Sequence, residues 1–171
     1  LFRSVVKALS NLDVEASIKW PNDIIVHNKK ICGILTELSA EMERVNYVVI
    51  GIGINIKTID FPDEIKEKAT SLYKEGYKLS RVDIVRQFCI EFEKLYKGYI
   101  LDGNKQDTLE LCRKYSAIIG KQVYVIKNNK RELVKCIDIN ENGNLIVKEK
   151  NGEIQEIMSG EVSIRGVKGY V

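Results

Sequence analysis

The chain has 171 residues, which is enough for one ordinary domain or for a larger and a smaller module that share an interface. Its 27 basic and 24 acidic residues leave a net charge of only +3, so no strong field points to nucleic acid or to an anionic membrane as a partner. No apolar run approaches the ~20 residues of a membrane-spanning helix, and the four cysteines lack CxxC or Cys/His spacing, which argues against a structural zinc and a disulfide framework. We therefore expect a soluble cytoplasmic protein.

The first residues predict an amphipathic helix, because apolar side chains recur on one helical stripe. The members of this stripe are Leu1, Phe2, Val5, Val6, Leu9 and Leu12. No N-cap precedes them and the first residue is not Met, so we expect the chain to begin inside an element of something longer. Four runs rich in Ile and Val follow, separated by polar turns, and predict a largely antiparallel sheet. These runs cover residues 16–20, 24–27, 31–38 and 47–56.

A polar stretch with one helical turn after Pro62 leads to a second predicted helix. Ser80 caps this helix, because Ser80 and Asp83 form a variant of the capping box. We expect the aromatic stripe of the helix to lie in the core. The stripe consists of Phe88, Phe92, Tyr96 and Tyr99.

A third helix is predicted over residues 105–115, after the break at DGN. From residue 117 onward the pattern is all strand: five short runs joined by Asn-Gly turns predict a small barrel. We place the domain boundary near Ser116, which divides the chain into residues 1–115 and 116–171.

The stretch KWPND gathers two charged side chains around a turn. Pro21 fixes its own backbone angle and biases Trp20 toward extended geometry, so Lys19 ends one strand and Asp23 lies in the turn before the next. Lys30 would then return to the sheet close to Asp23. The competing interpretation is that Asn-Lys-Lys is a solvated hairpin tip.

Glycines interrupt two of the apolar strand patterns, at Gly33 and in GIGIN at Gly51 and Gly53. Each glycine in a strand costs ~0.5 to 1 kcal/mol relative to alanine, so something should compensate. A flat ligand lying close to bare backbone would do so, with the amide of Asn55 able to donate and to accept. By spacing alone a bulged core strand fits as well. A dinucleotide fingerprint does not, because position 56 is Ile.

In this order, KWPND, KKICGIL, GIGIN and the C-terminal GEVSIRG closely resemble the biotin-protein ligases, also called biotin-[acetyl-CoA-carboxylase] ligases, over nearly the whole chain. The resemblance implies an α+β fold: a class II synthetase-like (biotin/lipoate ligase) mixed sheet with helices, followed by a small SH3-like β-barrel. It implies a ligase that uses ATP and Mg2+ to activate biotin as biotinyl-5'-AMP, and then transfers biotin to a lysine of a biotin carboxyl carrier protein, a subunit of acetyl-CoA carboxylase or a related carboxylase.

The resemblance also assigns roles to the matched residues. Lys30 would lie between the biotin carboxylate and the α-phosphate as the main electrostatic catalyst, with Lys19 and Asp23 also catalytic. The biotin-binding residues would be Lys30, Gly33, Gly51 and Ile54. The ATP-binding residues would be Lys19, Asn22, Asn55, Ala69 and Arg165. Mg2+ would be held by Asp23 and Asn55, and Glu161 with Arg165 would bring the small barrel back to the active site.

The chain departs from the family in one respect, because the Gly/Arg-rich loop that folds over biotin has no match in it. We therefore expect little or no biotinyl-adenylate from this chain alone. A winged-helix DNA-binding domain would also lie upstream, so nucleic acid is expected as a partner only if that domain exists. Homodimerisation is a further option. Two alternative functions remain: a lipoate-protein ligase-like enzyme, against which intact KWPND and GIGIN argue, and a non-catalytic fragment for carrier docking or dimerisation.

Overall fold

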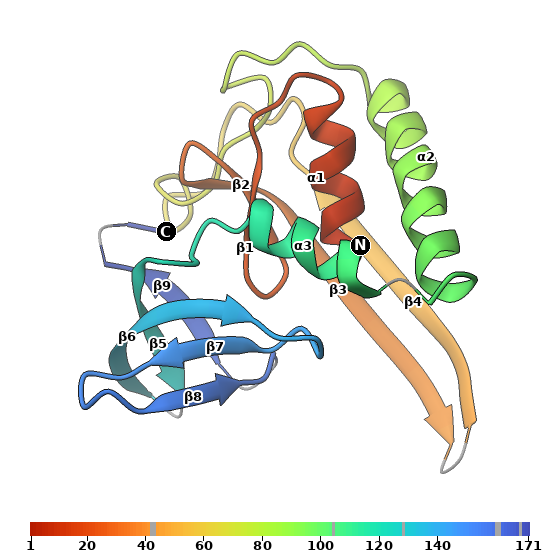
Figure 1. Ribbon diagram of the computed structural model, residues 1–171. Helices are drawn as coiled ribbons and strands as arrows, with labels where there is room; N and C mark the ends of the chain where they lie inside the picture. The colour runs from red at the N-terminus through yellow and green to blue at the C-terminus, as the bar shows by residue number, and fades with distance from the viewer. Residues whose placement is uncertain (42–43, 104, 128, 160–161, 168) are drawn as a thin grey trace.

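The computed structural model describes residues 1–41, 44–103, 105–127, 129–159, 162–167 and 169–171. In this part of the chain three helices accompany two antiparallel sheets, the α+β arrangement that the sequence predicts (Figure 1). The predicted site residue Glu161 lies outside the described residues.

The first sheet has four strands in the order β1-β2-β3-β4, all antiparallel. They are β1 (Ser17–Lys19), β2 (Asp23–Val26), β3 (Lys29–Glu41) and β4 (Arg44–Ile54). Helix α1 (Phe2–Ser10) packs its apolar stripe on one face of this sheet, where Val6 and Leu9 are buried with Ile24. The predicted N-terminal helix and four strands are thus confirmed. β3 extends beyond its predicted run at both ends, and β4 begins before its predicted run, because the polar ends continue the hairpin ladder; β4 ends at Ile54, before the predicted run does.

Helix α2 (Arg81–Ile100) begins where the sequence predicts. The backbone N–H of Asp83 donates to Ser80 Oγ over 3.1 Å. The expected burial of its aromatic stripe is only partly correct: Phe88 packs against the core, but Tyr96 is 54% and Tyr99 42% exposed. The physical reason is that both tyrosines lie at the rim of an open hollow, which Leu1 and Phe2 also line, so one side of each ring faces solvent.

The second sheet is the predicted small barrel, which follows helix α3 (Lys105–Lys114). Its five strands lie in the order β8-β7-β6-β5-β9 and enclose an apolar core that includes Cys136, Leu145 and Val147. The strands are β5 (Gln122–Lys127), β6 (Lys130–Ile139), β7 (Leu145–Lys148), β8 (Ile154–Ile157) and β9 (Ser163–Gly166).

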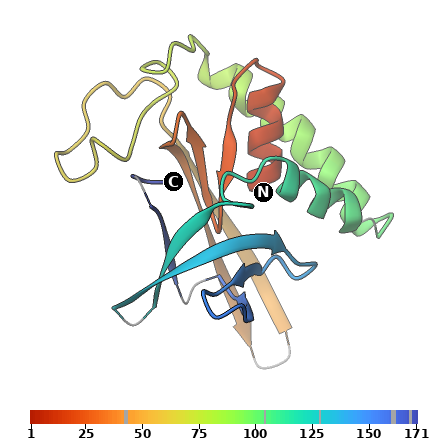
Figure 2. The ribbon, with the colours of Figure 1, turned by 60° about the vertical axis from the view of Figure 1, so that its left-hand side comes forward.

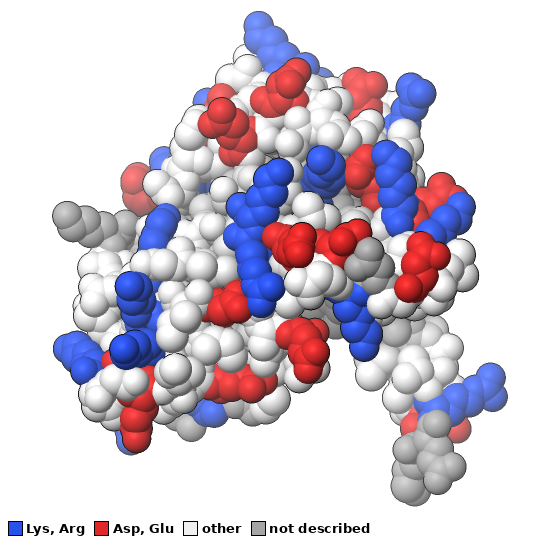
Figure 3. Space-filling model, viewed as in Figure 1, with Lys and Arg blue, Asp and Glu red and all other residues white. Residues whose placement is uncertain are grey.

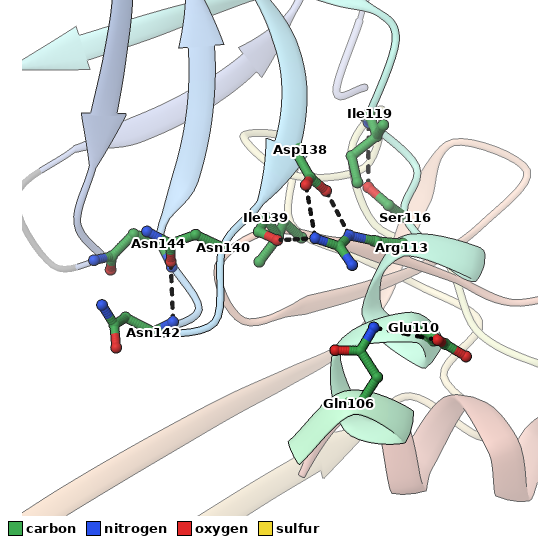
Figure 4. A network of polar contacts seen from close by, with 10 residues as sticks. All are labelled: Gln106, Glu110, Arg113, Ser116, Ile119, Asp138, Ile139, Asn140, Asn142 and Asn144. Atoms are coloured by element: carbon green, nitrogen blue, oxygen red, sulfur yellow. Dashed lines mark hydrogen bonds and ion pairs between the residues drawn. The ribbon is translucent and has the colours of Figure 1, made fainter. Parts of the chain in front are cut away.

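Three contacts attach the barrel to the first sheet or to helix α3. The indole of Trp20 is buried with the barrel core, and its Nε1–H donates to the carbonyl of Gly143 over 2.9 Å. Ile18 forms a parallel bridge with Ser116, which adds the connecting segment to the edge of β1. Arg113 of α3 makes a two-pronged ion pair with Asp138 of β6, with both N···O distances 2.7 Å (Figure 4). Trp20 thus belongs to the contact between the two sheets.

The far half of the β3–β4 hairpin runs clear of the helices in both ribbon views (Figures 1 and 2). Large apolar side chains are exposed there, including Leu38 at 62% and Tyr47 at 62%. Elsewhere basic and acidic side chains are interspersed over the face that Figure 3 shows, as the small net charge predicts. Among the described helices, none is long and apolar enough to cross a membrane.

Candidate functional site

Residues of the KWPND motif and Lys30 meet on one face of the first sheet because of a β-bulge. Lys19 pairs with Asp23 across β1 and β2, and Asp23 pairs with Gly33 across β2 and β3, so these three share a face. The register between β2 and β3 then shifts after Ile24, so that Ile25 pairs with Lys30 instead of with Ile31. The bulge re-aims Lys30 to the face that carries Asp23.

The side chains confirm that Lys30 lies beside Asp23, as the hairpin predicts. Lys30 Nζ lies 2.5 Å from Asp23 Oδ1, a contact of opposite charges rather than an aligned hydrogen bond. The hairpin tip consists of His27 and Asn28, both with positive φ, so Lys30 belongs to the strand and not to a solvated turn. A Cβ on Gly33 would lie 3.0 Å from Lys30 Nζ. This glycine therefore makes room for the lysine side chain as well as for any ligand above it.

Lys19 is 2% exposed, which is unusual for a lysine. Its ammonium lies 3.5 Å from the ring centroid of Tyr170, and the hydroxyl of Tyr170 donates to Asp23 Oδ2. Arg165 of β9 lies on the same ring, with Cζ 5.7 Å from its centroid. The pKa of Lys19 is lowered to about 8, mainly by burial. The carboxylate of Asp23 raises this pKa, whereas the nearby cations Arg165 and Lys30 lower it. Three cations are thus gathered around one carboxylate.

A shallow hollow of about 480 Å³ adjoins this cluster. Its lining residues are Asn22, Lys30, Gly33, Ile34, Leu35, Gly51, Ile52 and Gly53. Gly33 pairs with Gly53 and Leu35 with Gly51, so bare backbone forms much of the floor, with polar groups at one end. At that end Asn22 is held by its Nδ2–H, which donates to the carbonyl of Ile34 over 2.9 Å.

Ile54 does not line this hollow. Strand residues alternate between faces, and Ile54 pairs with Cys32 on the opposite face from Gly51 and Gly53. Its side chain packs against the core beneath the sheet. The prediction that Ile54 binds biotin together with Gly51 is therefore wrong, because the two residues face opposite sides of β4.

Ala69 and Asn55 lie on the other side of Lys30. The Lys30 N–H donates to the carbonyl of Lys68 over 2.7 Å, and the Thr70 N–H donates to the Lys30 carbonyl over 2.9 Å, which sets Ala69 alongside β3. Asn55 Nδ2–H donates to the Thr70 carbonyl over 3.1 Å. Asn55 therefore holds the segment that contains Ala69 and Thr70 in place, through its amide N–H.

Asp23 and Asn55 do not fit the predicted magnesium site. One carboxylate oxygen of Asp23 faces the ammonium of Lys30 and the other accepts from Tyr170, so both are already engaged. The Nδ2–H of Asn55 donates to Thr70, which leaves its Oδ1, and one amide oxygen without the carboxylate does not make a magnesium site. A dication at Asp23 would also face the ammonium of Lys19. No cluster of three or more acidic, His or Cys ligands occurs within the described residues. We derive no step through a metal ion held by these two residues.

The assembled groups can receive an anion beside a flat apolar ligand. Lys30 is about one third exposed and lines the glycine-floored hollow, whereas Lys19 is buried and neither Lys19 nor Arg165 lines the hollow. Preorganised cations of this kind stabilise developing negative charge without reorganisation. The lone histidine, His27, is 62% exposed and pairs with Glu75 over 2.5 Å, apart from these groups.

Tyr170 is the site residue that the sequence prediction missed. It follows the strand pattern of β9 by four residues, and its contact with Asp23 spans 147 positions of sequence. The only sequence signal is a Gly-Tyr pair next to the C-terminal residue, after the glycine that ends β9. An isolated aromatic residue at that place predicts neither the fold-back nor its destination.

Comparison with protein families gives two matches. Residues 1–55 match the biotin/lipoate A/B protein ligase family, and residues 118–165 match the biotin protein ligase C terminal domain. The bifunctional ligase/repressor BirA of Bacillus subtilis is 38% identical over 154 residues, which are 88% of this chain and 47% of that protein. The human biotin--protein ligase is 29% identical over 161 residues, 88% of this chain and 22% of that protein. The chain therefore spans about half the length, or less, of these curated relatives.

Solved structures agree with the sequence comparison. The biotin protein ligase from Aquifex aeolicus in complex with biotin and ATP superposes with a TM-score of 0.81 and 28% identity, covering 95% of this chain and 68% of that chain. Its apo structure gives a TM-score of 0.83 at the same identity, over 96% of this chain and 72% of that chain. The predicted fold class, including the SH3-like barrel, is confirmed.

Proposed function

The chain belongs to the biotin protein ligase family, and from that premise we propose that it serves in the ATP-dependent activation of biotin to biotinyl-5'-AMP and in transfer of biotin to a lysine of a carrier protein. One observation carries the proposal most strongly: Lys30 stands between a glycine-floored hollow and a buried cluster of cations. The Aquifex relative, which binds biotin and ATP, supports it.

In the proposed reaction the flat ring system of biotin lies over Gly33, Gly51 and Gly53, with its carboxylate toward Lys30. The ATP lies on the side of Lys19 and Ala69, so that Lys30 faces both the attacking carboxylate and the α-phosphate. Lys30 must then exchange its contact with Asp23 for contacts with these anions, and its charge stabilises the negative charge that develops as they join. Two reactants held in line by these groups gain the further advantage of orientation.

Biotin is the proposed substrate rather than lipoate. The family matched by residues 1–55 includes lipoate ligases, so lipoate is the second candidate. The match of residues 118–165 to a biotin protein ligase domain favours biotin. A biotin carboxyl carrier protein as acceptor and a cytoplasmic location are proposals on the same ground.

Biotin-dependent exchange of pyrophosphate into ATP tests the proposal, in this chain and in the natural protein at its full length. In the full-length protein Lys30→Ala should lower the exchange rate roughly 100-fold, as loss of one preorganised donor does elsewhere. Lys29→Ala is the matched control, because Lys29 precedes Lys30 in β3 and is not among the residues that line the hollow.

An unchanged rate in Lys30→Ala would refute the assigned role of Lys30. Exchange that depends on lipoate and not on biotin would refute the choice of substrate. In this chain alone the expected rate is little or none, and full activity would show that the Gly/Arg-rich loop absent from it is dispensable.

A further inference from the structure

The last residues of the chain form a hook that leads from the barrel back to the first sheet. After β9 the chain reverses, with the Gly166 N–H donating to the Tyr170 carbonyl over 3.4 Å. A Cβ on Gly166 would lie 2.3 Å from the carbonyl carbon of Val171, which no side chain could tolerate. Gly169 has φ +96°, a conformation that glycine adopts without strain. Glycine at both positions permits the hook. In the ribbon views the C terminus lies close to the first sheet (Figures 1 and 2).

The hook places the side chain of Tyr170 against the first sheet, where its ring and its hydroxyl make different contacts. Its ring face receives the ammonium of Lys19 at 3.5 Å from the centroid, a cation–π geometry in a buried place. Its hydroxyl donates to Asp23 Oδ2. Because Asp23 Oδ1 faces the ammonium of Lys30, the carboxylate links the hook to Lys30 as well.

The other charged groups of the cluster explain why Lys19 needs its contact with Tyr170. Lys30 and Arg165 both repel the ammonium of Lys19, and among the residues that the structure describes, which exclude Glu161, Asp23 is the one acidic side chain recorded as acting on Lys19. The ring of Tyr170 offers a negative face to the ammonium of Lys19, and Arg165 lies near the same ring. Without that ring, the buried ammonium of Lys19 would lose this contact while the repulsion from Arg165 and Lys30 remained, so turning outward into solvent would be favourable.

We propose that Tyr170 is a positioning residue for the nucleotide end of the site: its ring holds Lys19, and its hydroxyl orients Asp23 and through it Lys30. This rests on the proposed function. Tyr170 touches no reacting group in this arrangement. The small barrel therefore contributes to activation through its last residues, and the ring and the hydroxyl have separable effects.

The first test measures the site itself, without substrates. Mass spectrometry after brief treatment with acetic anhydride should show Lys19 protected in the wild-type chain. Tyr170→Leu and Gly166→Ala should each raise its labelling rate about tenfold or more, whereas Tyr170→Phe, which keeps the ring, should not. Gly98→Ala is the control for an added methyl group, because Gly98 lies in α2 and a Cβ there would meet nothing within 4 Å. Should Tyr170→Leu fail to fold, carboxypeptidase trimming of the last two residues of the folded protein makes the same comparison. Unchanged Lys19 labelling in Tyr170→Leu, or in the trimmed protein, would overturn the proposal.

The second test separates the ring from the hydroxyl in pyrophosphate exchange by the full-length protein. Tyr170→Leu should raise KM for ATP about tenfold, while KM for biotin stays within about twofold. Tyr170→Phe should leave KM for ATP near the wild-type value and lower kcat several-fold. A merely structural role would lower both variants' active fraction equally, and that result would overturn the assignment. If the wild-type protein catalyses no exchange with biotin, the proposed function fails, and the labelling experiment still decides whether the hook holds Lys19.

Discussion

The barrel and the site end of the first sheet are both built from short antiparallel strands, yet they bury different chemistry. In the barrel the buried side chains include Cys136, Leu145 and Val147, which are apolar. At the site end Lys19 and Asp23 are buried instead. Burying apolar surface stabilises a fold, whereas burying charge costs free energy unless partners restore it. The barrel therefore stabilises, and the site end uses part of that stability to hold cations in place.

The largest effect on stability is expected from the barrel. Leu145 is completely buried in β7, so Leu145→Ala leaves a cavity and should lower the free energy of unfolding by about 2 to 5 kcal/mol. Urea denaturation followed by far-UV circular dichroism measures this. Under native conditions the protection of Lys19 should be unchanged. A loss below about 1 kcal/mol would show that the barrel core is not the stabilising region.

A substitution at Lys19 is expected to raise the free energy of unfolding instead of lowering it. Lys19→Met removes a buried charge and keeps much of the side-chain volume, while Asp23 retains Lys30 and Tyr170 as partners. The variant should therefore be more stable than the wild type at pH 7, on the order of 1 to 3 kcal/mol, and should lose pyrophosphate exchange.

The stability that Lys19→Met gains over the wild type should also depend on pH. The pKa of Lys19 is lowered to about 8 from 10.5, so between these values the unfolded chain binds more protons than the folded chain. Wild-type stability should rise through this window, and its deficit relative to Lys19→Met should close as the pH approaches 10.5. Urea denaturation at intervals from pH 7 to pH 10.5 measures the difference, with the exposed strand lysine variant Lys148→Met as the control. A variant that is less stable than wild type at pH 7 would contradict the idea that the site end is costly.

The same contrast explains how far the sequence could predict the molecule. Barrel strands follow from alternation and Asn-Gly turns, which are local signals, and the proximity of Lys30 to Asp23 follows from a simple hairpin. The bulge that turns Lys30 onto the right face is not visible in the run of Ile and Lys residues. Ile54 is predicted to bind biotin from the family resemblance, but it does not line the hollow and its side chain packs against the core of the first sheet. Tyr170 depends on a contact between the two ends of the fold, which no local pattern encodes.

The smallest effect is expected where the two regions meet at the surface. Arg113 and Asp138 form a well-aligned pair, and the hydrogen bonds from Arg113 hold the pKa of Asp138 below its usual value. Both side chains are more than one third exposed, so solvent screening limits what the pair contributes. Asp138→Asn, which keeps one acceptor, should lower the free energy of unfolding by less than about 1 kcal/mol. Because the folded-state pKa is lowered, this contribution should be present above the usual pKa of an aspartate and disappear as the pH falls through the folded-state value.

High salt offers a second check on Asp138, since 1 M NaCl shortens the screening length to about 3 Å and should remove most of the difference between wild type and Asp138→Asn. Glu141→Gln, which changes an exposed acid on the following loop, should show no comparable dependence on salt. If Asp138→Asn instead exposed Lys19 to labelling, the pair would be part of the coupling between barrel and site. The prediction is that it is not, because Trp20, the Ile18–Ser116 bridge and the Tyr170 hook attach the barrel to the first sheet independently of Arg113.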